Sequence, residues 1–214
     1  MDPSLRITEI FYSLQGETHT VGIPTVFIRL TGCPLRCGYC DTAYAFSGGE
    51  KMSLDDILAR VAEYGCQYVT VTGGEPLAQP ACIDLLNRLT SLDYLVSLET
   101  SGALDVSAVN PLVVKVMDLK TPSSGESARN LYSNIHYLTA QDQVKFVIAD
   151  EADYQWSCQQ IRELKLTERC QVLFSPVEQS MPAVELADKI LADRLPVRFQ
   201  IQLHKYLWND ARGK

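Results

Sequence analysis

The strongest constraint on the fold is the alternation, along most of the chain, of short apolar runs with segments of helical periodicity. The runs expected to form strands are residues 7–13, 25–30, 67–72, 94–99, 112–118, 143–149, 170–175 and 197–203. The segments expected to form helices are residues 53–65, a segment beginning near Pro80, residues 153–164 and residues 181–193. Strands that alternate with helices are joined by right-handed crossovers and form a mostly parallel sheet. We expect about six of these runs to form the core of the sheet, fewer than the eight strands of a closed barrel. The fold expected is therefore α/β, an incomplete, TIM-like barrel.

Composition limits the class of protein. The chain has 214 residues, a length that suits a single domain over residues 1–214. Its net charge of −7 argues against nonspecific nucleic-acid binding, which needs clustered Lys and Arg. No apolar run approaches the ~20 residues of a membrane span, and the first residues lack the basic-then-apolar layout of a signal peptide. Seven cysteines without such a signal favour a cytoplasmic protein whose thiols stay reduced.

Three of these cysteines, Cys33, Cys37 and Cys40, form a C-x3-C-x2-C array in the loop after the run 25–30. A disulfide framework would leave one of the three thiols over. A zinc site normally closes with a fourth ligand, and no fourth Cys or His follows within about twenty residues. A cubane iron–sulfur cluster with three protein thiolates would leave one iron open to another ligand. The alternatives are three unrelated cysteines on a loop and a zinc-binding interaction module without catalytic activity.

The carboxyl ends of the expected strands are rich in glycine and polar residues. These turns are residues 72–75, 99–102, 118–120 and 175–176. Ligands bind at this edge of open α/β sheets and barrels. We therefore expect a binding site where these turns meet the cysteine loop.

Arg29 interrupts an otherwise apolar expected strand. A guanidinium group in such a run is costly unless it has an anionic partner or reaches water. The sequence leaves two interpretations open. Arg29 forms a salt bridge inside the protein, or its planar fork binds a carboxylate ligand.

The cysteine spacing resembles the signature of the radical S-adenosylmethionine (SAM) enzymes, and residues 73–76, Gly-Gly-Glu-Pro, resemble a second element of that superfamily. The resemblance implies one 4Fe–4S cluster per chain and SAM as cofactor, with cleavage of SAM to a 5′-deoxyadenosyl radical. It implies that the backbone of this element, at Gly74 and Glu75, meets the amino group of SAM and that Tyr39 lies beside the adenine. An activating enzyme that makes a glycyl radical on a partner protein, with the same cluster and SAM chemistry, is an alternative within the superfamily.

Further motifs resemble one family, 7-carboxy-7-deazaguanine synthase of the queuosine and deazapurine pathway. They are residues 9–17, 27–30, 40–42, 72–76, 99–102 and 202–207. The "LQGE", "CDT" and "HKY" elements discriminate this family from the rest of the superfamily. The resemblance implies a lyase that contracts the ring of 6-carboxy-5,6,7,8-tetrahydropterin, with loss of ammonia, to 7-carboxy-7-deazaguanine. It also implies a homodimer, and a reducing partner such as flavodoxin or ferredoxin.

The family resemblance assigns roles to individual residues. Substrate contacts are expected from Leu14, Gln15, Gly16, Glu17, Arg29 and Thr72, and further SAM contacts from Lys120, Lys145 and Ser175. Thr42 is expected to bind Mg²⁺, a hard cation suited to a hydroxyl oxygen, or else to cap a helix. An N-terminal extension of about residues 1–24 and a C-terminal tail of about residues 197–214 are expected to complete the substrate site. Asp118-Leu119-Lys120 departs from the Ser-Pro-Lys of many relatives, and the chain continues beyond the point where some relatives end.

The remaining cysteines and histidines carry weaker expectations. Cys66, Cys82, Cys158 and Cys170 are expected to be small buried hydrophobic residues. His19 and His136 are expected at the surface. His204 either shapes the site or serves the structure.

Overall fold

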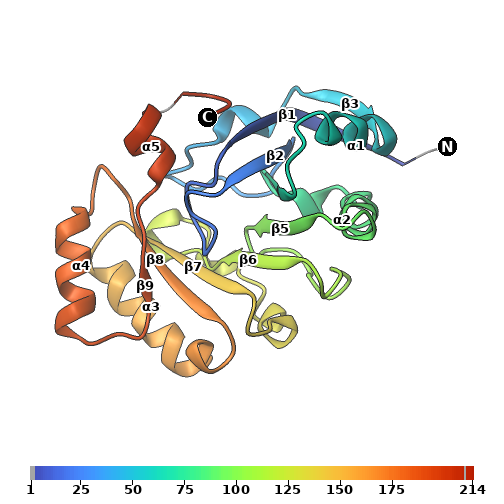
Figure 1. The fold of residues 1–214 in the computed structure, drawn as a ribbon. Coiled ribbons are helices and arrows are strands. Elements are labelled where there is room, and N and C mark those ends of the chain that lie inside the picture. The colour runs from blue at the N-terminus through green and yellow to red at the C-terminus, as the bar shows by residue number, and fades with distance from the viewer. Residues whose placement is uncertain (1–2, 210) are drawn as a thin grey trace.

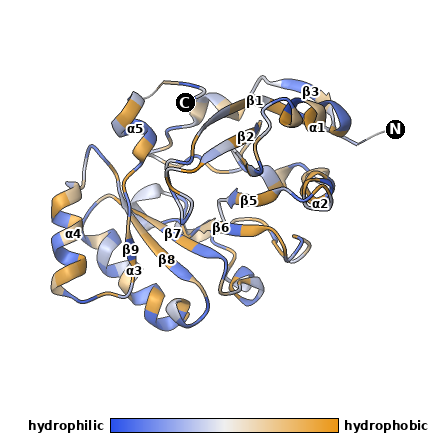
Figure 2. Cartoon of the chain, in the orientation of Figure 1, coloured by the Kyte–Doolittle hydropathy of each residue, from blue (hydrophilic) through white to orange (hydrophobic). Residues whose placement is uncertain are grey.

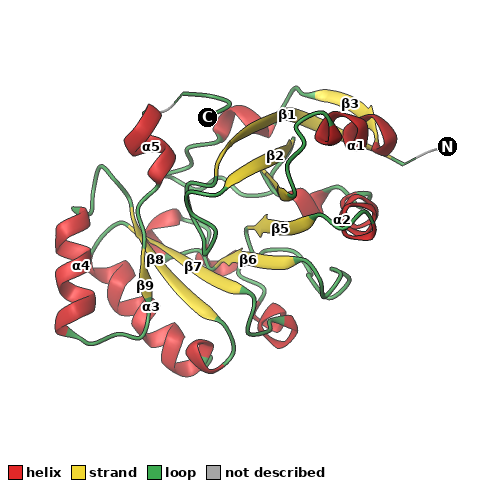
Figure 3. Cartoon of the chain, in the orientation of Figure 1, coloured by secondary structure: helices red, strands yellow, loops and turns green. Residues whose placement is uncertain are grey.

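A computed structural model describes residues 3–209 and 211–214, that is, the chain without Met1, Asp2 and Asp210. One sheet of nine strands runs through it, in the order β3-β1-β2-β4-β5-β6-β7-β8-β9 (Figures 1 and 3). The strands are β1 Ser4–Leu14, β2 Pro24–Leu30, β3 Glu50–Ser53, β4 Tyr68–Gly73, β5 Leu95–Thr100, β6 Val114–Asp118, β7 Gln143–Ile148, β8 Gln171–Pro176 and β9 Arg198–Phe199. The α-helices are α1 Leu54–Ala62, α2 Cys82–Ser91, α3 Glu151–Glu163, α4 Ala183–Ala192 and α5 Leu203–Trp208.

The sheet is an open, mostly parallel barrel fragment. Strands β2 and β4 to β9 pair in parallel, whereas β1 pairs antiparallel with both β2 and β3. The two edge strands, β3 and β9, lie at opposite ends of the strand order. This arrangement confirms the expected incomplete barrel. Within the described residues, no helix is both long and apolar enough to span a bilayer.

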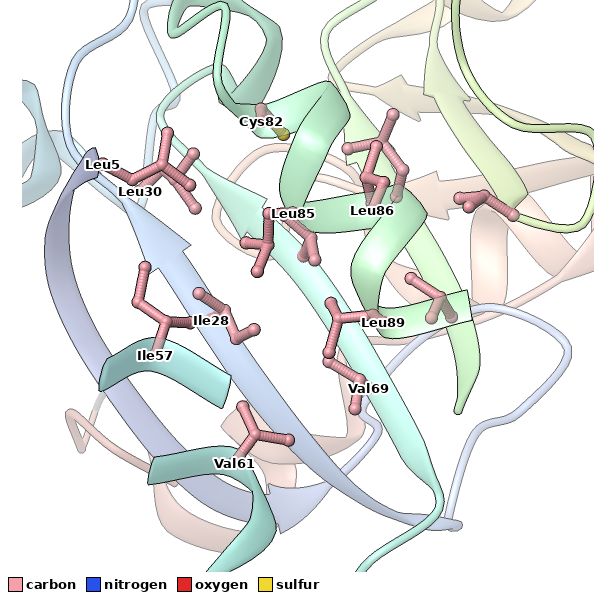
Figure 4. Close-up of a cluster of buried hydrophobic side chains, with 14 of the residues drawn as sticks. Leu5, Ile28, Leu30, Ile57, Val61, Val69, Cys82, Leu85, Leu86 and Leu89 are labelled. Carbon is pink, nitrogen blue, oxygen red and sulfur yellow. The ribbon is translucent and has the colours of Figure 1, made fainter. Parts of the chain in front are cut away.

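Alternation within the strands separates a helix-covered face from a polar face. In β4, Val69 and Val71 are buried in the hydrophobic core, whereas Thr70 and Thr72 point to the opposite face. The core forms two clusters, the first packing α1 and α2 on β1, β2, β4 and β5 (Figure 4). The second packs α3 and α4 on β6, β7 and β8, and Figure 2 shows the mixed hydropathy of these elements. The polar face is therefore free to line a site.

Helix α1 forms as the sequence predicts. The Ser53 hydroxyl oxygen accepts a hydrogen bond from the Asp56 backbone N–H at 3.1 Å, which caps the helix. Leu54, Ile57, Leu58 and Val61 are buried on one face. The cap and the apolar stripe together fix where α1 begins and which face it presents to the sheet.

The expected strand 197–203 is wrong beyond its first residues. Only Arg198–Phe199 pair with β8, and Leu203 begins α5. Pairing with β8 ends because the following residues bind the loop after β1 instead. The Leu203 N–H donates to the Gly16 carbonyl at 2.9 Å. The amide side chain of Gln200 accepts from the Thr18 N–H at 2.9 Å. These two bonds draw the chain away from the sheet edge and toward the cavity described below.

Strand β3 was not expected, since three of its four residues are polar and it lies at an edge of the sheet. Cys82, Cys158 and Cys170 are buried as expected, but Cys66 is not fully buried. It lies in the turn before β4, where its thiol donates to the Pro24 carbonyl at 3.2 Å.

A buried ion pair joins β6 to the loop before β7. The Lys115 ammonium lies 3.1 Å from Asp142 Oδ2, with side-chain exposures of 3% and 0%. Asp142 also accepts hydrogen bonds from the backbone N–H groups of Lys115 and Thr139, each at 2.7 Å. The carboxylate is thereby satisfied inside the protein.

We expect Lys115→Met to lower the free energy of unfolding by roughly 3–5 kcal/mol, because Asp142 would remain as an uncompensated buried charge. The measurement is urea-induced unfolding. Arg60→Met is the matched control, since the Arg60–Glu63 pair is exposed and worth about 1 kcal/mol or less. An equal loss of unfolding free energy in the two variants would contradict the conclusion that the Lys115–Asp142 pair is buried and Asp142 depends on it.

Candidate active site

A cavity of about 290 Å³ lies at the carboxyl ends of the parallel strands. Its walls come from the ends of β1, β2 and β4 to β8, from the cysteine loop and from the segment after β9. With the exception of Glu75, every site residue expected from the sequence lines it. Residues far apart in the chain, such as Leu14 and Ser175, are thus brought to one space.

The cysteine loop follows β2 and is held by its backbone. The Gly38 N–H donates to the Ser124 carbonyl at 3.0 Å, and the Gly32 N–H donates to the Ala45 carbonyl at 2.8 Å. Cys33, Cys37 and Cys40 are free, partly exposed and on the cavity wall. Burial raises the pKa of the Cys33 and Cys37 thiols, so these two must lose protons when they bind a metal centre.

The two glycines at the end of β4 allow the cysteine loop to approach the sheet. The Glu75 N–H donates to the Gly32 carbonyl at 2.8 Å. A Cβ on Gly74 would overlap that same carbonyl oxygen and lie 3.0 Å from Cys33 Cβ. A Cβ on Gly73 would lie 2.7 Å from the Leu30 carbonyl oxygen. The glycine pair is therefore a packing requirement of the cysteine loop, and it leaves backbone rather than side chain at the cavity.

Glu75 does not line the cavity. Its side chain is fully buried, and its carboxylate accepts hydrogen bonds from the Thr100 hydroxyl, the Ser101 N–H and the Leu77 N–H. Its side chain thus ties the turn after β4 to the end of β5. Any contact with a cofactor would come from the backbone of this turn.

A chain of mostly buried charges crosses the floor of the cavity, with side-chain exposures between 11% and 20%. The Lys145 ammonium lies 2.6 Å from Glu17 Oε2 and 3.3 Å from Asp118 Oδ1, and the Lys120 ammonium lies 2.7 Å from Asp118 Oδ2. Burial opposes the charged ammonium groups, yet the neighbouring carboxylates raise the pKa of Lys120 and raise that of Lys145 well above its ordinary range. Both lysines are cationic at neutral pH. They connect the expected substrate residue Glu17 to the expected cofactor residues.

The expected aromatic and hydroxyl contacts lie on the same wall. The Tyr39 hydroxyl is 3.3 Å from the Thr121 hydroxyl, and burial raises the pKa of Tyr39. Ser175, at the end of β8, is buried and also lines the cavity.

The loop after β1 supplies a rigid polar edge. The Gln15 side-chain amide donates to the Thr70 hydroxyl at 3.1 Å and to Glu99 Oε1 at 3.3 Å. Its amide oxygen accepts from the Glu17 N–H at 3.2 Å. The Thr72 hydroxyl donates to Glu99 Oε2 at 2.9 Å. These side chains are ordered by one another before any ligand binds.

The sequence analysis did not assign three residues of this cavity to the site: Glu99 and Gln202 were missed, and the role of His204 was left open. Burial raises the pKa of Glu99, whose position in the turn 99–102 was the available signal. Gln202 donates to Glu17 Oε1 at 2.8 Å and to Asp41 Oδ2 at 3.0 Å. His204 packs so closely on Gly16 that a Cβ there would overlap its Nδ1, and burial lowers the pKa of His204. His204 therefore shapes the site.

Arg29 forms the internal salt bridge that was one of its two interpretations. Its Nε donates to Glu9 Oε1 at 2.7 Å, and the Tyr44 hydroxyl donates to the same oxygen at 2.7 Å. The side chain still lines the cavity, with 16% of its surface exposed. Glu9 binds the guanidinium group at Nε, and one outer nitrogen donates to the Gly73 carbonyl at 3.5 Å.

Thr42 is free of a capping role. It precedes the short 3₁₀ helix η1, Ala43–Phe46, but its side chain makes no capping hydrogen bond. Its hydroxyl instead donates to Asp41 Oδ1 at 2.8 Å, which leaves the oxygen lone pairs available. Burial opposes the Asp41 carboxylate, yet the charge of Lys205 and bonds from Gln202 and Thr42 hold its pKa below the usual range.

The donor set fits the cluster expected from the cysteine array. Three thiols on one loop line one cavity, and the glycine turn beside them has no side chain in the way. Within residues 3–209 and 211–214, no three His, Cys, Asp or Glu side chains converge as a single metal ion requires.

Comparison with known proteins agrees with this site. The model of the radical SAM superfamily matches residues 27–117. The open barrel is similar to the crystal structure of QueE from Escherichia coli, with a TM-score of 0.78 at 23% identity, over 94% of this chain and 95% of that one. It is also similar in fold to Streptococcus suis SuiB bound to S-adenosylmethionine, with a TM-score of 0.56 at 15% identity, over 80% of this chain and 45% of that one. The fold and the site define a radical SAM enzyme, a class that uses a 4Fe–4S cluster and SAM.

Two curated relatives identify the family. The chain is 44% identical to the 7-carboxy-7-deazaguanine synthase of Chlorobaculum tepidum over 98% of its own length and 97% of that protein. It is 40% identical to the 7-carboxy-7-deazaguanine synthase of Koribacter versatilis over 98% of its own length and all of that protein. The chain belongs to the 7-carboxy-7-deazaguanine synthase family, which acts in queuosine biosynthesis on a small-molecule pterin. The chain therefore does not belong to the glycyl-radical-activating enzymes or to the zinc-binding modules, two alternatives that the sequence left open.

We expect Gly74→Ala to lower the iron bound per chain at least severalfold, because the new Cβ would displace the Gly32 carbonyl and crowd the Cys33 side chain at its Cβ. Iron and acid-labile sulfide analysis after anaerobic reconstitution measures this. Gly38→Ala is the matched control in the same loop, since a Cβ there meets only the Ser123 carbonyl oxygen at 3.8 Å. Full iron content in Gly74→Ala would refute the packing role of Gly74.

Proposed function

We propose that this cavity binds 6-carboxy-5,6,7,8-tetrahydropterin against the cysteine loop and contracts its ring to 7-carboxy-7-deazaguanine, with loss of ammonia. The supporting observation is that Gln15, Glu17, Arg29 and Thr72 share one cavity wall with the three thiols. When bound, the cluster and SAM supply the radical that takes hydrogen from the pterin carbon bearing the carboxylate. The protein positions the reactants and excludes competing ones.

The cofactor end of the cavity is assigned to the cysteine loop and the turn after β4. Cys33, Cys37 and Cys40 hold the cluster as thiolates. The backbone at Gly74 receives the amino group of SAM, and Tyr39 lies against the adenine. The partly buried lysines Lys120 and Lys145 and the Ser175 hydroxyl complete this end, with Lys145 held between Glu17 and Asp118.

The aminopyrimidinone edge of the pterin is assigned to the loop after β1. Gln15, Glu17 and the backbone from Leu14 to Gly16 present donors and acceptors to it, and Glu99 adds a buried carboxylate. Thr72 orients Glu99. Because these groups are already hydrogen-bonded to one another, little side-chain entropy is lost on binding.

The carboxylate end of the pterin is assigned to Arg29 and to a Mg²⁺ ion at Thr42. The outer nitrogens of Arg29 give a planar fork that matches a carboxylate. The Thr42 oxygen suits Mg²⁺, whose other positions would be water and the substrate carboxylate. The hydroxyl proton of Thr42 is already donated to Asp41, so its lone pairs are the available groups.

We expect Thr42→Ala to raise the Mg²⁺ concentration needed for half-maximal turnover by roughly tenfold. Thr42→Ser keeps the hydroxyl and should stay close to the wild type. Steady-state assays over a Mg²⁺ titration measure both variants. A serine variant as impaired as the alanine variant would remove the hydroxyl from the metal site.

The direct test of the reaction is turnover by the anaerobically reconstituted, reduced protein. We expect carboxytetrahydropterin to yield 7-carboxy-7-deazaguanine, seen by mass spectrometry, only when SAM is present. Cys37→Ser should abolish the product. An intact cluster that cleaves SAM without forming this product would exclude the pterin as substrate while leaving the superfamily chemistry in place.

The family resemblance also implies an oligomeric state, a reducing partner, a location and a domain organisation for this chain. We infer a homodimer, a reducing partner such as flavodoxin or ferredoxin, and a cytoplasmic location. Residues 1–24 and 197–214 would serve the substrate site, consistent with the contacts of Gln15, Glu17 and Gln202 in the cavity. The whole chain, residues 1–214, would act as one domain.

A further inference from the structure

Among the described residues, the cationic side chains that line the cavity are paired with carboxylates, except in the last segment, residues 211–214. Four Lys and Arg side chains line the cavity before that segment: Arg29, Lys120, Lys145 and Lys205. Each has a carboxylate oxygen within 3.1 Å of its nitrogen. A substrate carboxylate entering this space therefore meets cations whose charge is largely neutralised.

Arg212 is a cavity-lining cation of a different kind. Its guanidinium carbon lies 4.2 Å from the centroid of the Tyr44 ring. Within the described residues, no carboxylate lies within ion-pair distance of it. Among the described residues, an aromatic face rather than an anion holds this charge in place, and no hydrogen bond engages the guanidinium donors.

The fold brings Arg212 back to the site by a turn after α5. Asn209 has a φ of 54° and Gly213 a φ of 70°, both in the left-handed region that reverses the chain. Gly213 then lies against Phe11 of β1, with a Cβ position 4.0 Å from Phe11 Cβ. Figure 1 shows the C-terminal end of the chain beside the cyan helix that carries Tyr44.

Tyr44 links Arg212 to Arg29. The Tyr44 hydroxyl donates to Glu9 Oε1, the same oxygen that binds Arg29 Nε. The two guanidinium carbons lie 4.2 Å and 5.9 Å from the Tyr44 ring centroid. Tyr44 is two residues from Thr42, so both forks border the end of the cavity assigned to the substrate carboxylate.

We propose that Arg212 binds the substrate carboxylate together with Arg29 and thereby selects carboxylated over uncarboxylated pterins. This inference rests on the proposed function of the cavity and adds a specificity-determining residue to it. The stacked, planar guanidinium loses less freedom on forming a bidentate bond than a mobile lysine would. Lys214, which also lines the cavity, has no such aromatic support among the described contacts.

The test compares two pterins on the anaerobic holoenzyme loaded with SAM. Dissociation constants are measured for 6-carboxytetrahydropterin and for tetrahydropterin without the carboxylate. We expect Arg212→Gln to weaken binding of the carboxylated compound about tenfold, the effect of one lost charge-assisted hydrogen bond. Binding of the uncarboxylated compound should change less than twofold, and KM should rise with little change in kcat.

Two further variants separate charge from structure. Arg212→Lys keeps the charge without the planar fork and should recover part of the discrimination. Arg169→Gln removes an exposed arginine before β8, at the opposite edge of the sheet, and should leave both constants unchanged. Equal weakening of both pterins in Arg212→Gln, or no change in either, would overturn the proposal. A wild-type holoenzyme that binds neither pterin would instead overturn the proposed function itself.

Discussion

The structure depends on the close approach of two backbones, the turn after β4 and the cysteine loop after β2. The loop and the turn share a hydrogen bond from the Glu75 N–H to the Gly32 carbonyl, and glycine at position 74 leaves room for it. Below the turn, the buried Glu75 carboxylate ties it to the end of β5. The thiols are consequently fixed relative to the sheet edge where the substrate residues emerge. A cofactor held by these thiols would meet a ligand held by β1, β2 and β4 without further rearrangement.

Buried charges connect the two ends of the cavity. Glu17, Lys145, Asp118 and Lys120 form one continuous set of ion pairs from the loop after β1 to the turn after β6. Burying such charges is costly unless each is paired, and their mutual pairing is what keeps the two lysines protonated. The set therefore acts as a rigid, preorganised floor whose electrostatic field does not reorganise when a ligand binds.

Local patterns in the sequence predicted most of the strands and helices and most site positions, because each of these is set by short-range periodicity or by a motif. Helix α1 follows from its cap and its stripe, and the cavity residues follow from motifs at strand ends. Side-chain partners on neighbouring strands could not be predicted from the sequence. The pairing of Arg29 with Glu9, for example, depends on the antiparallel register of β1 and β2. Helix α5 was missed for a similar reason: residues 197–203 alternate like a strand, but Gly16 captures the backbone of Leu203. Only the folded chain shows that Arg212 returns to Tyr44.

The most direct test of the account is electron paramagnetic resonance on the reduced, anaerobically reconstituted protein, recorded with and without SAM. The account predicts the signal of one reduced 4Fe–4S cluster per chain, with g values that shift when SAM is added, because three thiolates leave one iron open. A signal that does not respond to SAM, or a colourless protein with stoichiometric zinc, would contradict it.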